Sequence, residues 1–253
     1  MWQQVQRWFG KESAQASVAE RLAELWPADM HNHLIPGVDD GVSTLEDSLT
    51  CLRQFAAWGI RRVVATPHLS QDYHPNTAGQ LREAVKLVQQ GIADEQLPIE
   101  FSVAAEYLLD EQFDELLRRD ELLSFGPKQY VLIETGWAAA PRQLDHWVFD
   151  LQRKGYTPVL AHPERYRYYQ SEPYLLKQLR EQGCLLQLNL MSLSGRYGQK
   201  AQRLAHDLLR EQAISFVGSD LHRPADLPTL QSVFTGSGWQ ELTKQPLLNQ
   251  HLV

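Results

Sequence analysis

The sequence predicts an α/β protein that folds as a TIM-like barrel of about seven β/α units. Seven short apolar runs alternate with longer amphipathic helical patterns, which indicates parallel strands covered by helices. The connections are short and no Gly/Ser-rich linker divides the chain, so one barrel accounts for the 253 residues. An open doubly wound sheet is the alternative fold, but its glycine-rich signature is missing after the first run.

The predicted strands and helices follow one another in strict alternation. The strands cover residues 28–34, 61–68, 99–107, 129–135, 156–162, 184–189 and 214–222. The helices cover residues 44–59, 77–91, 111–119, a segment after Pro141, 173–181, 198–212 and a segment from about Pro224. Thr44 or Ser43 suits the N-cap of the first helix, and Gly59 suits its end.

Residues 1–27 do not fit the β/α pattern, whereas residues 28–253 form the predicted barrel domain. Four apolar residues of this N-terminal extension are spaced like one face of a helix: Val18, Leu22, Leu25 and Trp26. We expect a helix that closes the bottom of the barrel. A contact between copies in a homo-oligomer and an element on a membrane surface are the alternatives.

Composition limits the classes of partner. The formal net charge is -7 and no long basic stripe occurs, which argues against nucleic acid as the main partner. The two cysteines, Cys51 and Cys184, are far apart and favour a reducing compartment over a disulfide framework. No run of about 18 apolar residues predicts a transmembrane helix, and the N-terminus lacks the apolar core of a signal peptide. We therefore expect a cytoplasmic protein that is not integral to a membrane.

Nine side chains able to bind metal fall at or just beyond the ends of the predicted strands. They are His31, His33, Asp40, His68, Glu106, Glu134, His162, Asp220 and His222. The carboxyl ends of parallel barrel strands meet at one rim, which carries the active site. Ionised carboxylates gathered at one rim are costly to bury unless cations neutralise them. The pattern therefore predicts a metal site, and only the sixth strand ends in a weaker candidate, Asn189.

The spacing of these residues indicates more than one ion. Residues two apart on a strand point to the same face, so His31 and His33 point together, as do Asp220 and His222. Nine ligands are too many for one ion and fit two or three, with Glu106 as the natural bridge. Mixed imidazole and carboxylate ligands suit zinc, iron or manganese.

The charges of the predicted site favour a phosphate ester as substrate. Three divalent ions would outweigh the four carboxylates and leave a cationic pocket in a net-acidic protein. Arg165 and Arg223 follow the fifth and seventh strands and could bind phosphate oxygens or support acid-base chemistry, as could Asp40. The chemistry inferred is hydrolysis by metal-bound hydroxide.

Six motifs of the sequence resemble those of the polymerase and histidinol phosphatase (PHP) superfamily. They are HNHLIPGVDDG, ATPH, AAEY, VLIE, PVLAHPERY and GSDLH, in that order. The closer resemblance is to the metal-dependent tyrosine phosphatases of the CpsB/YwqE type, which act in capsule and exopolysaccharide synthesis. It covers about residues 29–223 and implies a distorted (β/α)7 barrel. The implied substrate is a phosphotyrosine protein, the tyrosine kinase of polysaccharide assembly.

The resemblance also implies a distribution of ligands over three ions, with Mn²⁺ favoured and iron or zinc as alternatives. The first ion would bind His31, His33, Glu106 and Asp220. The second would bind Glu106, Glu134 and His162, and the third Asp40, His68 and His222. Arg165 matches a phosphate-binding arginine of the family, and Asp39 suits a partner that orients a ligand histidine.

The sequence argues against two other enzyme classes and leaves two other functions open. A cysteine-based tyrosine phosphatase is excluded, because no arginine lies six positions after Cys51 or Cys184. An amidohydrolase is disfavoured, because the fourth strand ends in Glu134 and not in a lysine. A phosphatase for histidinol phosphate or another small metabolite stays open, as does a non-catalytic kinase-binding scaffold. Four aromatic residues could line a slot for phosphotyrosine: Tyr73, Trp137, Tyr166 and Tyr168.

Overall fold

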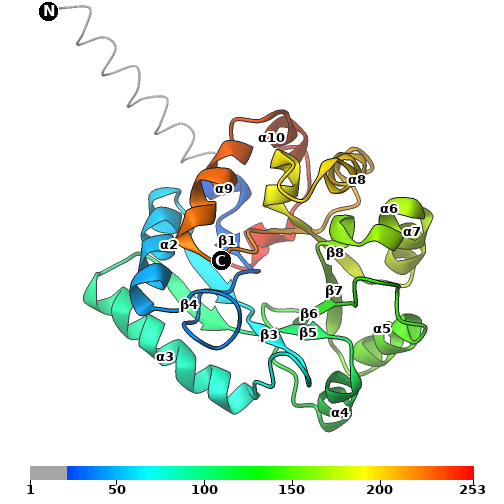
Figure 1. The fold of residues 1–253 in the computed structure, drawn as a ribbon, viewed down its shortest axis with the longest axis horizontal. Coiled ribbons are helices and arrows are strands. Elements are labelled where there is room, and N and C mark those ends of the chain that lie inside the picture. Colours follow the sequence, from blue (N-terminus) through cyan, green and yellow to red (C-terminus); the bar gives the residue numbers. More distant parts are fainter. Residues whose placement is uncertain (1–21) are drawn as a thin grey trace, which may run out of the picture.

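The computed structural model describes residues 22–253, in which helices surround a central group of parallel strands (Figure 1). A three-stranded sheet has the order β1-β2-β4 and contains β1 (Ala28–Asp29), β2 (Arg62–Ala65) and β4 (Glu100–Val103). A six-stranded sheet has the order β3-β5-β6-β7-β8-β9. Its members are β3 (His68–Leu69), β5 (Glu106–Leu108), β6 (Tyr130–Glu134), β7 (Thr157–Ala161), β8 (Leu185–Asn189) and β9 (Phe216–Gly218).

Four of the predicted strands are not continuous: the first and the last are shortened to β1 and β9, each followed by one isolated bridge residue, and two others divide into two strands. Residues 61–68 divide into β2 and β3 around Pro67, which has no N–H to donate. Residues 99–107 divide into β4 and β5 at the neighbouring position. Parallel hydrogen bonds cross both interruptions, from the N–H of Ala104 to the carbonyl of Ala65 (2.8 Å) and from the N–H of Glu106 to that of Pro67 (3.1 Å). The two sheets are therefore connected side by side.

The first and last strand regions also lie side by side. A parallel bridge joins Asn32 to Leu221, and the N–H of Asp220 donates to the carbonyl of His31 at 2.7 Å. Below it, the buried Asp29 carboxylate accepts hydrogen bonds from the backbone and hydroxyl of Ser219 at 2.9 and 2.8 Å. The parallel sheet is thus strongly curled, and the ends of its strands face a common centre.

The helices lie close to the predicted positions. They are α2 (Leu45–Ala57), α3 (Ala78–Asp94), α4 (Glu111–Arg119), α5 (Leu144–Arg153), α6 (Arg167–Ser171), α7 (Tyr174–Glu181), α8 (Gln199–Arg210), α9 (Leu227–Val233) and α10 (Ser237–Leu242). Short 3-10 turns follow β7, β8 and β9 and precede the C-terminus: η1 (Pro163–Arg165), η2 (Leu190–Ser194), η3 (Pro224–Asp226) and η4 (Leu248–His251). Thr44 caps α2 as predicted, since its side chain accepts from the N–H of Asp47 at 3.1 Å.

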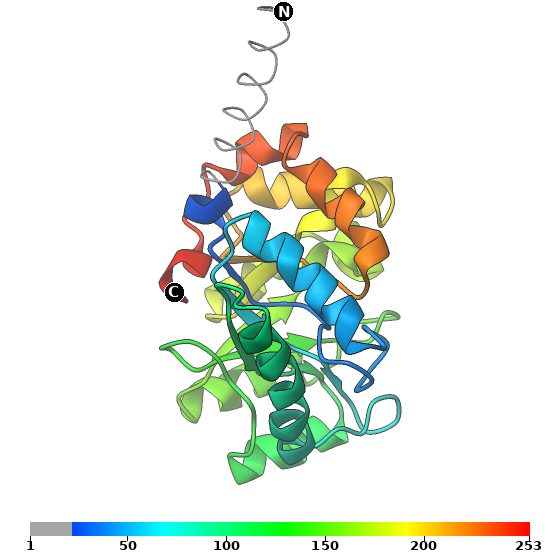
Figure 2. The same cartoon turned by 90° about the vertical axis from the view of Figure 1, so that its left-hand side faces the viewer.

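The helices α2 and α3 pack against one another on one side of the molecule (Figure 2). Their close approach depends on Gly91, because a Cβ at this position would lie 3.1 Å from two side-chain atoms of Leu49. The buried face of α2 includes Leu49, Leu52 and Phe55.

Within residues 22–253, no helix is long and apolar enough to cross a membrane.

The described end of the predicted N-terminal extension packs into the core. Residues 22–25 are helical, and Leu22, Leu25 and Trp26 are buried. The ring of Trp26 meets that of Phe55 edge to face, with 5.7 Å between centroids. Val18 lies outside the described residues, and the boundary between residues 27 and 28 stays a prediction.

Candidate metal centre

The two histidines of the first strand region face a pair of carboxylates. Nε2 of His31 lies 3.1 Å from Glu106 and 3.4 Å from Asp220. Nε2 of His33 lies 3.4 and 3.3 Å from the same two oxygens. All four side chains are buried. Residues from β5 and from both meeting ends of the curled sheet therefore converge on one point.

Glu106 connects this point to side chains at the start of β3, at the end of β6 and just after β7. Its Oε1 lies 2.9 Å from Nε2 of His162, and its Oε2 lies 3.3 Å from Nδ1 of His68. The same Nδ1 lies 3.0 Å from Oε1 of Glu134. Glu106 thus occupies the centre of the set.

The third part of the set lies nearer the surface. Oδ1 of Asp40 is 3.4 Å from Nε2 of His222 and 3.7 Å from Nε2 of His68. Nδ1 of His222 lies 3.0 Å from the backbone carbonyl of Asp220, which leaves Nε2 directed to Asp40. Asp40 is more than half exposed, so this part opens towards solvent.

The nine predicted ligands form four overlapping groups in which one ligand atom per residue lies within 4.8 Å of the others. The groups are His31/His33/Asp220, His31/Glu106/His162, His68/Glu106/Glu134, and His33/Asp40/His68/His222. The last contains all three ligands predicted for the third ion. The ligands predicted for the first ion are divided, because Glu106 is not in the group of His31, His33 and Asp220. Those predicted for the second ion are divided as well, because His162 and Glu134 lie in different groups.

The donor atoms fit divalent cations. Nε2 of His33 and Nδ1 of His68 are buried and make no hydrogen bond within residues 22–253. Unpaired buried nitrogens are unfavourable, and here they face carboxylate oxygens across a few ångströms. A cation among these atoms would bind both kinds of donor at once.

The histidines and carboxylates of the cluster stabilise one another's charged forms. Burial lowers the pKa of His31, but Glu106 and Asp220 outweigh burial and raise that pKa to about 9. Burial opposes ionisation of Glu106 as well, yet the charge of His31 holds the pKa of Glu106 well below its usual value. Burial and the charge of Glu106 raise the pKa of Glu134. Cations could replace the protons of the histidines in this role, since metal binding requires neutral imidazole.

Two side chains outside the predicted ligand set orient the first two histidines. Nδ1 of His31 lies 2.8 Å from Oε1 of Gln187, and Nδ1 of His33 lies 2.7 Å from Oδ2 of Asp39. Each bond assigns the Nδ1 proton and leaves Nε2 free for a metal. Asp39 was expected in this position. Gln187 was missed, because a glutamine within an apolar strand carries no signal of its own.

Two of the predicted ligands adopt the left-handed backbone conformation. His162 has φ 34° and Asp220 has φ 50°, values that are uncommon for residues other than glycine. Asp220 also lies two residues beyond the end of β9 (Phe216–Gly218), so the predicted two-residue strand spacing is not what brings it beside His222. Such strain costs about 1–3 kcal/mol and concentrates at functional sites. Asn189 helps to hold Asp220, since its Nδ2 donates to Oδ2 of Asp220 at 2.8 Å.

A cavity of about 500 Å³ opens over the cluster. Six of the predicted ligands line it: Asp40, His68, Glu134, His162, Asp220 and His222. Arg165 lines it too, with Nη1 2.6 Å from Oδ2 of Asp220. Arg223 is not among its lining residues; its side chain is mostly exposed and lies 3.3 Å from Asp226. The structure thus separates the two predicted phosphate-binding arginines.

Only two of the four aromatic residues expected to form a slot lie at the cavity. Tyr73 and Trp137 line the cavity, whereas Tyr166 and Tyr168 do not. Tyr166 is fully buried, and its hydroxyl accepts a hydrogen bond from the N–H of Thr135 at 3.2 Å. Tyr168 bonds to the hydroxyl of Thr135. These two tyrosines support the segment before Trp137 from below.

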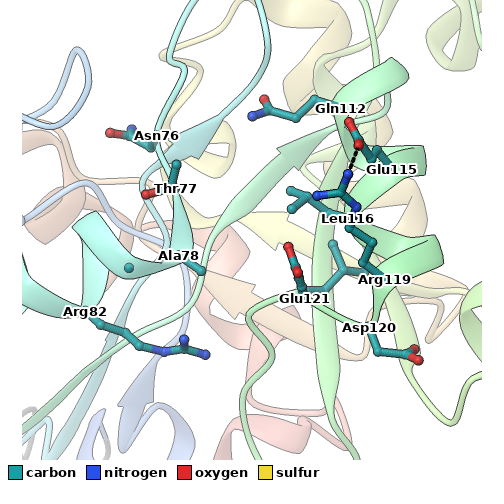
Figure 3. A pocket seen from close by; sticks show the side chains of 12 residues that line it. Asn76, Thr77, Ala78, Arg82, Gln112, Glu115, Leu116, Arg119, Asp120 and Glu121 are labelled. Atoms are coloured by element: carbon teal, nitrogen blue, oxygen red, sulfur yellow. Dashed lines mark hydrogen bonds and ion pairs between the residues drawn. The ribbon is translucent and has the colours of Figure 1, made fainter.

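A separate cavity of about 620 Å³ lies between the start of α3 and α4 (Figure 3). Arg119 forms an ion pair with Glu115 there, and Arg82 extends from the opposite helix. None of the predicted ligands lines this cavity. Among the described residues, the groups of side chains that could hold a metal ion all lie at the strand ends and not at this cavity.

The two cysteines are free and buried. Burial raises the pKa of both Cys51 and Cys184 to about 12. A thiol of such pKa is almost fully protonated at neutral pH and is a poor nucleophile. This agrees with the exclusion of a cysteine-based mechanism.

Fold and site together define an α/β protein with histidine and carboxylate clusters, able to hold metal ions, at the carboxyl ends of a curled parallel sheet. The family model described as "Capsular polysaccharide synthesis, CpsB/CapC" matches residues 27–234. The chain belongs to the CpsB/CapC family.

Relatives of the chain carry tyrosine phosphatase names. The tyrosine-protein phosphatase YwqE of Bacillus subtilis is 34% identical over 194 residues, which are 77% of this chain and 76% of YwqE. The tyrosine-protein phosphatase CpsB of Streptococcus pneumoniae is 28% identical over 202 residues, 77% of this chain and 82% of CpsB. A solved structure from a study of YwqE and CpsB as "unique metal-dependent tyrosine phosphatases" superposes with a TM-score of 0.76 at 32% identity. It covers 85% of this chain and 89% of that chain.

Proposed function

We propose that the protein is a metal-dependent phosphomonoesterase that hydrolyses protein phosphotyrosine. The observation that carries this proposal is the position of Arg165, whose guanidinium borders the same cavity as six of the predicted metal ligands. An arginine fork beside a cluster of divalent ions suits a phosphate ester. The names of the relatives supply the tyrosine specificity.

We further propose three divalent ions, with Mn²⁺ favoured and iron or zinc as alternatives. His31, His33, Glu106 and Asp220 would hold the first ion, and Glu106, Glu134 and His162 the second. Asp40, His68 and His222 would hold the third. The overlap of four groups of ligand atoms and the unpaired nitrogens of His33 and His68 support more than one ion, and the group that contains Asp40, His68 and His222 supports the third site.

The side chains around the ions then have separate tasks. When bound, the ions supply an acidic water and neutralise phosphate charge. Arg165 binds the phosphoryl oxygens and is held in place by Asp220. Asp39 and Gln187 fix the rings of His33 and His31. The phenol of tyrosine has a pKa near 10, so the leaving group needs little protonation.

For the fold, we propose a distorted (β/α)7 barrel of the PHP type over residues 28–253, with residues 1–27 as an additional segment. For the partner, we propose a tyrosine kinase of polysaccharide export or assembly, in view of the capsule-synthesis description of the family. We place the protein in the cytoplasm, where two free, buried thiols fit a reducing environment.

The alternative is a phosphatase for histidinol phosphate or another small metabolite, since a cavity of about 500 Å³ also suits a small molecule. A side-by-side assay separates the two. The metal-loaded enzyme is given a phosphotyrosine peptide, the matching phosphoserine peptide and histidinol phosphate at equal concentrations. We expect the highest kcat/KM for the phosphotyrosine peptide. A higher value for histidinol phosphate would overturn the proposal in favour of the metabolite.

A further inference from the structure

A tyrosine, a leucine and a tryptophan line the cavity over the predicted metal ligands. They are Tyr73, Leu108 and Trp137, and we name these three residues the aryl lip. They come from the segment after β3, from β5 and from the segment after β6, and these three strands are neighbours in the sheet. Leu108 is in register with Glu134, so the lip adjoins the predicted ligands directly.

Trp137 is the largest member of the lip, and its position is fixed although its side chain remains half exposed. The guanidinium of Arg165 lies 5.0 Å from the centre of its ring. The ring of His162 lies nearly parallel at 6.0 Å, and that of Tyr166 lies at 5.1 Å. Even with these contacts, 51% of Trp137 is exposed. An exposed aromatic side chain that lines a concave site together with a few polar groups is typical of a ligand-binding site.

The contact between Trp137 and Arg165 relates the lip to the phosphate. Because the guanidinium of Arg165 lies beside the indole of Trp137, a phosphate bound by Arg165 would bring its ester group close to that ring. An aryl ester group would pack on the exposed indole, and aromatic pairs contribute about 0.5–1.5 kcal/mol beyond the area they bury. A short alkyl group would gain little there.

We propose that the aryl lip binds the ring of the leaving group and that Trp137 determines the preference for aryl over alkyl phosphate esters. This inference rests on the proposed function, because it assumes that a phosphate ester is bound at Arg165. It assigns Trp137 to specificity and leaves the phosphoryl chemistry to the cluster.

The test compares two ligands that differ only in this group, phenylphosphonate and methylphosphonate, whose C–P bonds resist hydrolysis. Binding to the metal-loaded enzyme is measured by calorimetry. We expect phenylphosphonate to bind the native enzyme roughly tenfold more tightly, a difference of about 1.4 kcal/mol. Trp137→Ala and Trp137→Leu should remove most of this ratio, whereas Trp137→Phe should keep most of it. Phe149→Ala, which alters a 59% exposed ring on α5 outside the cavity, is the matched control.

Each other outcome has a defined meaning. The proposal is wrong if the native enzyme binds phenylphosphonate and methylphosphonate equally well. It is also wrong if the ratio of the two affinities is unchanged in Trp137→Ala. An equal loss of both affinities in Trp137→Ala and Trp137→Leu also overturns it, because Trp137 would then only position Arg165. Metal content and melting temperature, measured alongside, show whether each variant is folded. If the ratio behaves as expected but the native enzyme does not turn over a phosphotyrosine peptide, the proposed function fails and the lip stands.

Discussion

Nδ1 of His31 and Oε1 of Gln187 lie 2.8 Å apart, and both side chains are fully buried. The same Oε1 lies 3.2 Å from the backbone N–H of His162. One glutamine of β8 therefore orients a side chain from the first strand region and the backbone at the end of β7. The ring of His31 cannot turn without breaking this buried hydrogen bond.

Gln187→Leu should weaken metal binding, because His31 would lose the acceptor that keeps Nε2 directed at the cluster. We expect affinity for the divalent ions to fall roughly tenfold to a hundredfold, as for other residues that orient metal ligands. Titration of the chelator-treated protein with Mn²⁺ measures the effect. Gln245→Leu is the control, since Gln245 is buried but bonds to the backbone of Leu209. Equal metal affinity in the two variants would show that Gln187 only supports the fold.

Removal of the ions should abolish phosphatase activity and lower the melting temperature. Without cations, Glu106 depends on the histidines for charge compensation, and Asp220 depends on the histidines and on Arg165. We expect two to three bound transition-metal ions per chain by elemental analysis, loss of activity in chelator, and recovery on adding Mn²⁺. Full activity of a protein shown to contain no metal would contradict the proposed mechanism.

The two arginines should behave differently. Arg165→Ala should raise KM for a phosphotyrosine peptide about tenfold to a hundredfold, because hydrogen bonds to charged groups contribute roughly 1.5–3 kcal/mol. Arg223→Ala should change KM less than about twofold, since its side chain points to Asp226 outside the cavity. Steady-state kinetics at equal metal content decide the matter. Comparable increases in KM in the two variants would show that Arg223 also binds the substrate.

Thiol reagents should leave the enzyme active. Burial holds the pKa of Cys51 and Cys184 near 12, so few thiolates form at neutral pH. We expect native-like kcat/KM after treatment with iodoacetamide and in the Cys51→Ala and Cys184→Ala variants. Inactivation by iodoacetamide that substrate prevents would point to a thiol at the active site and count against the metal mechanism.

Much of the fold could be predicted because the strand and helix patterns are local. The helix at 111–119 and the cap at Thr44 occur where the sequence places them. The β-branched residues Val63 and Val64 favoured one strand up to His68, whereas Pro67, which cannot donate to a sheet, is the signal for the interruption there. Neither α6 nor α10 was predicted, because each has only one or two turns and little periodicity.

The sequence by itself determined which side chains could hold metal and that they would meet. Parallel strands have their carboxyl ends at one edge, so residues at those ends must come together once the sheet curls. The tertiary structure decided which neighbours these residues have. It selected Arg165 over Arg223, brought Gln187 to His31 across 156 residues, and placed Trp137 and not Tyr166 at the cavity. These relationships depend on contacts between distant segments and on the left-handed backbone of His162 and Asp220, which no local pattern encodes.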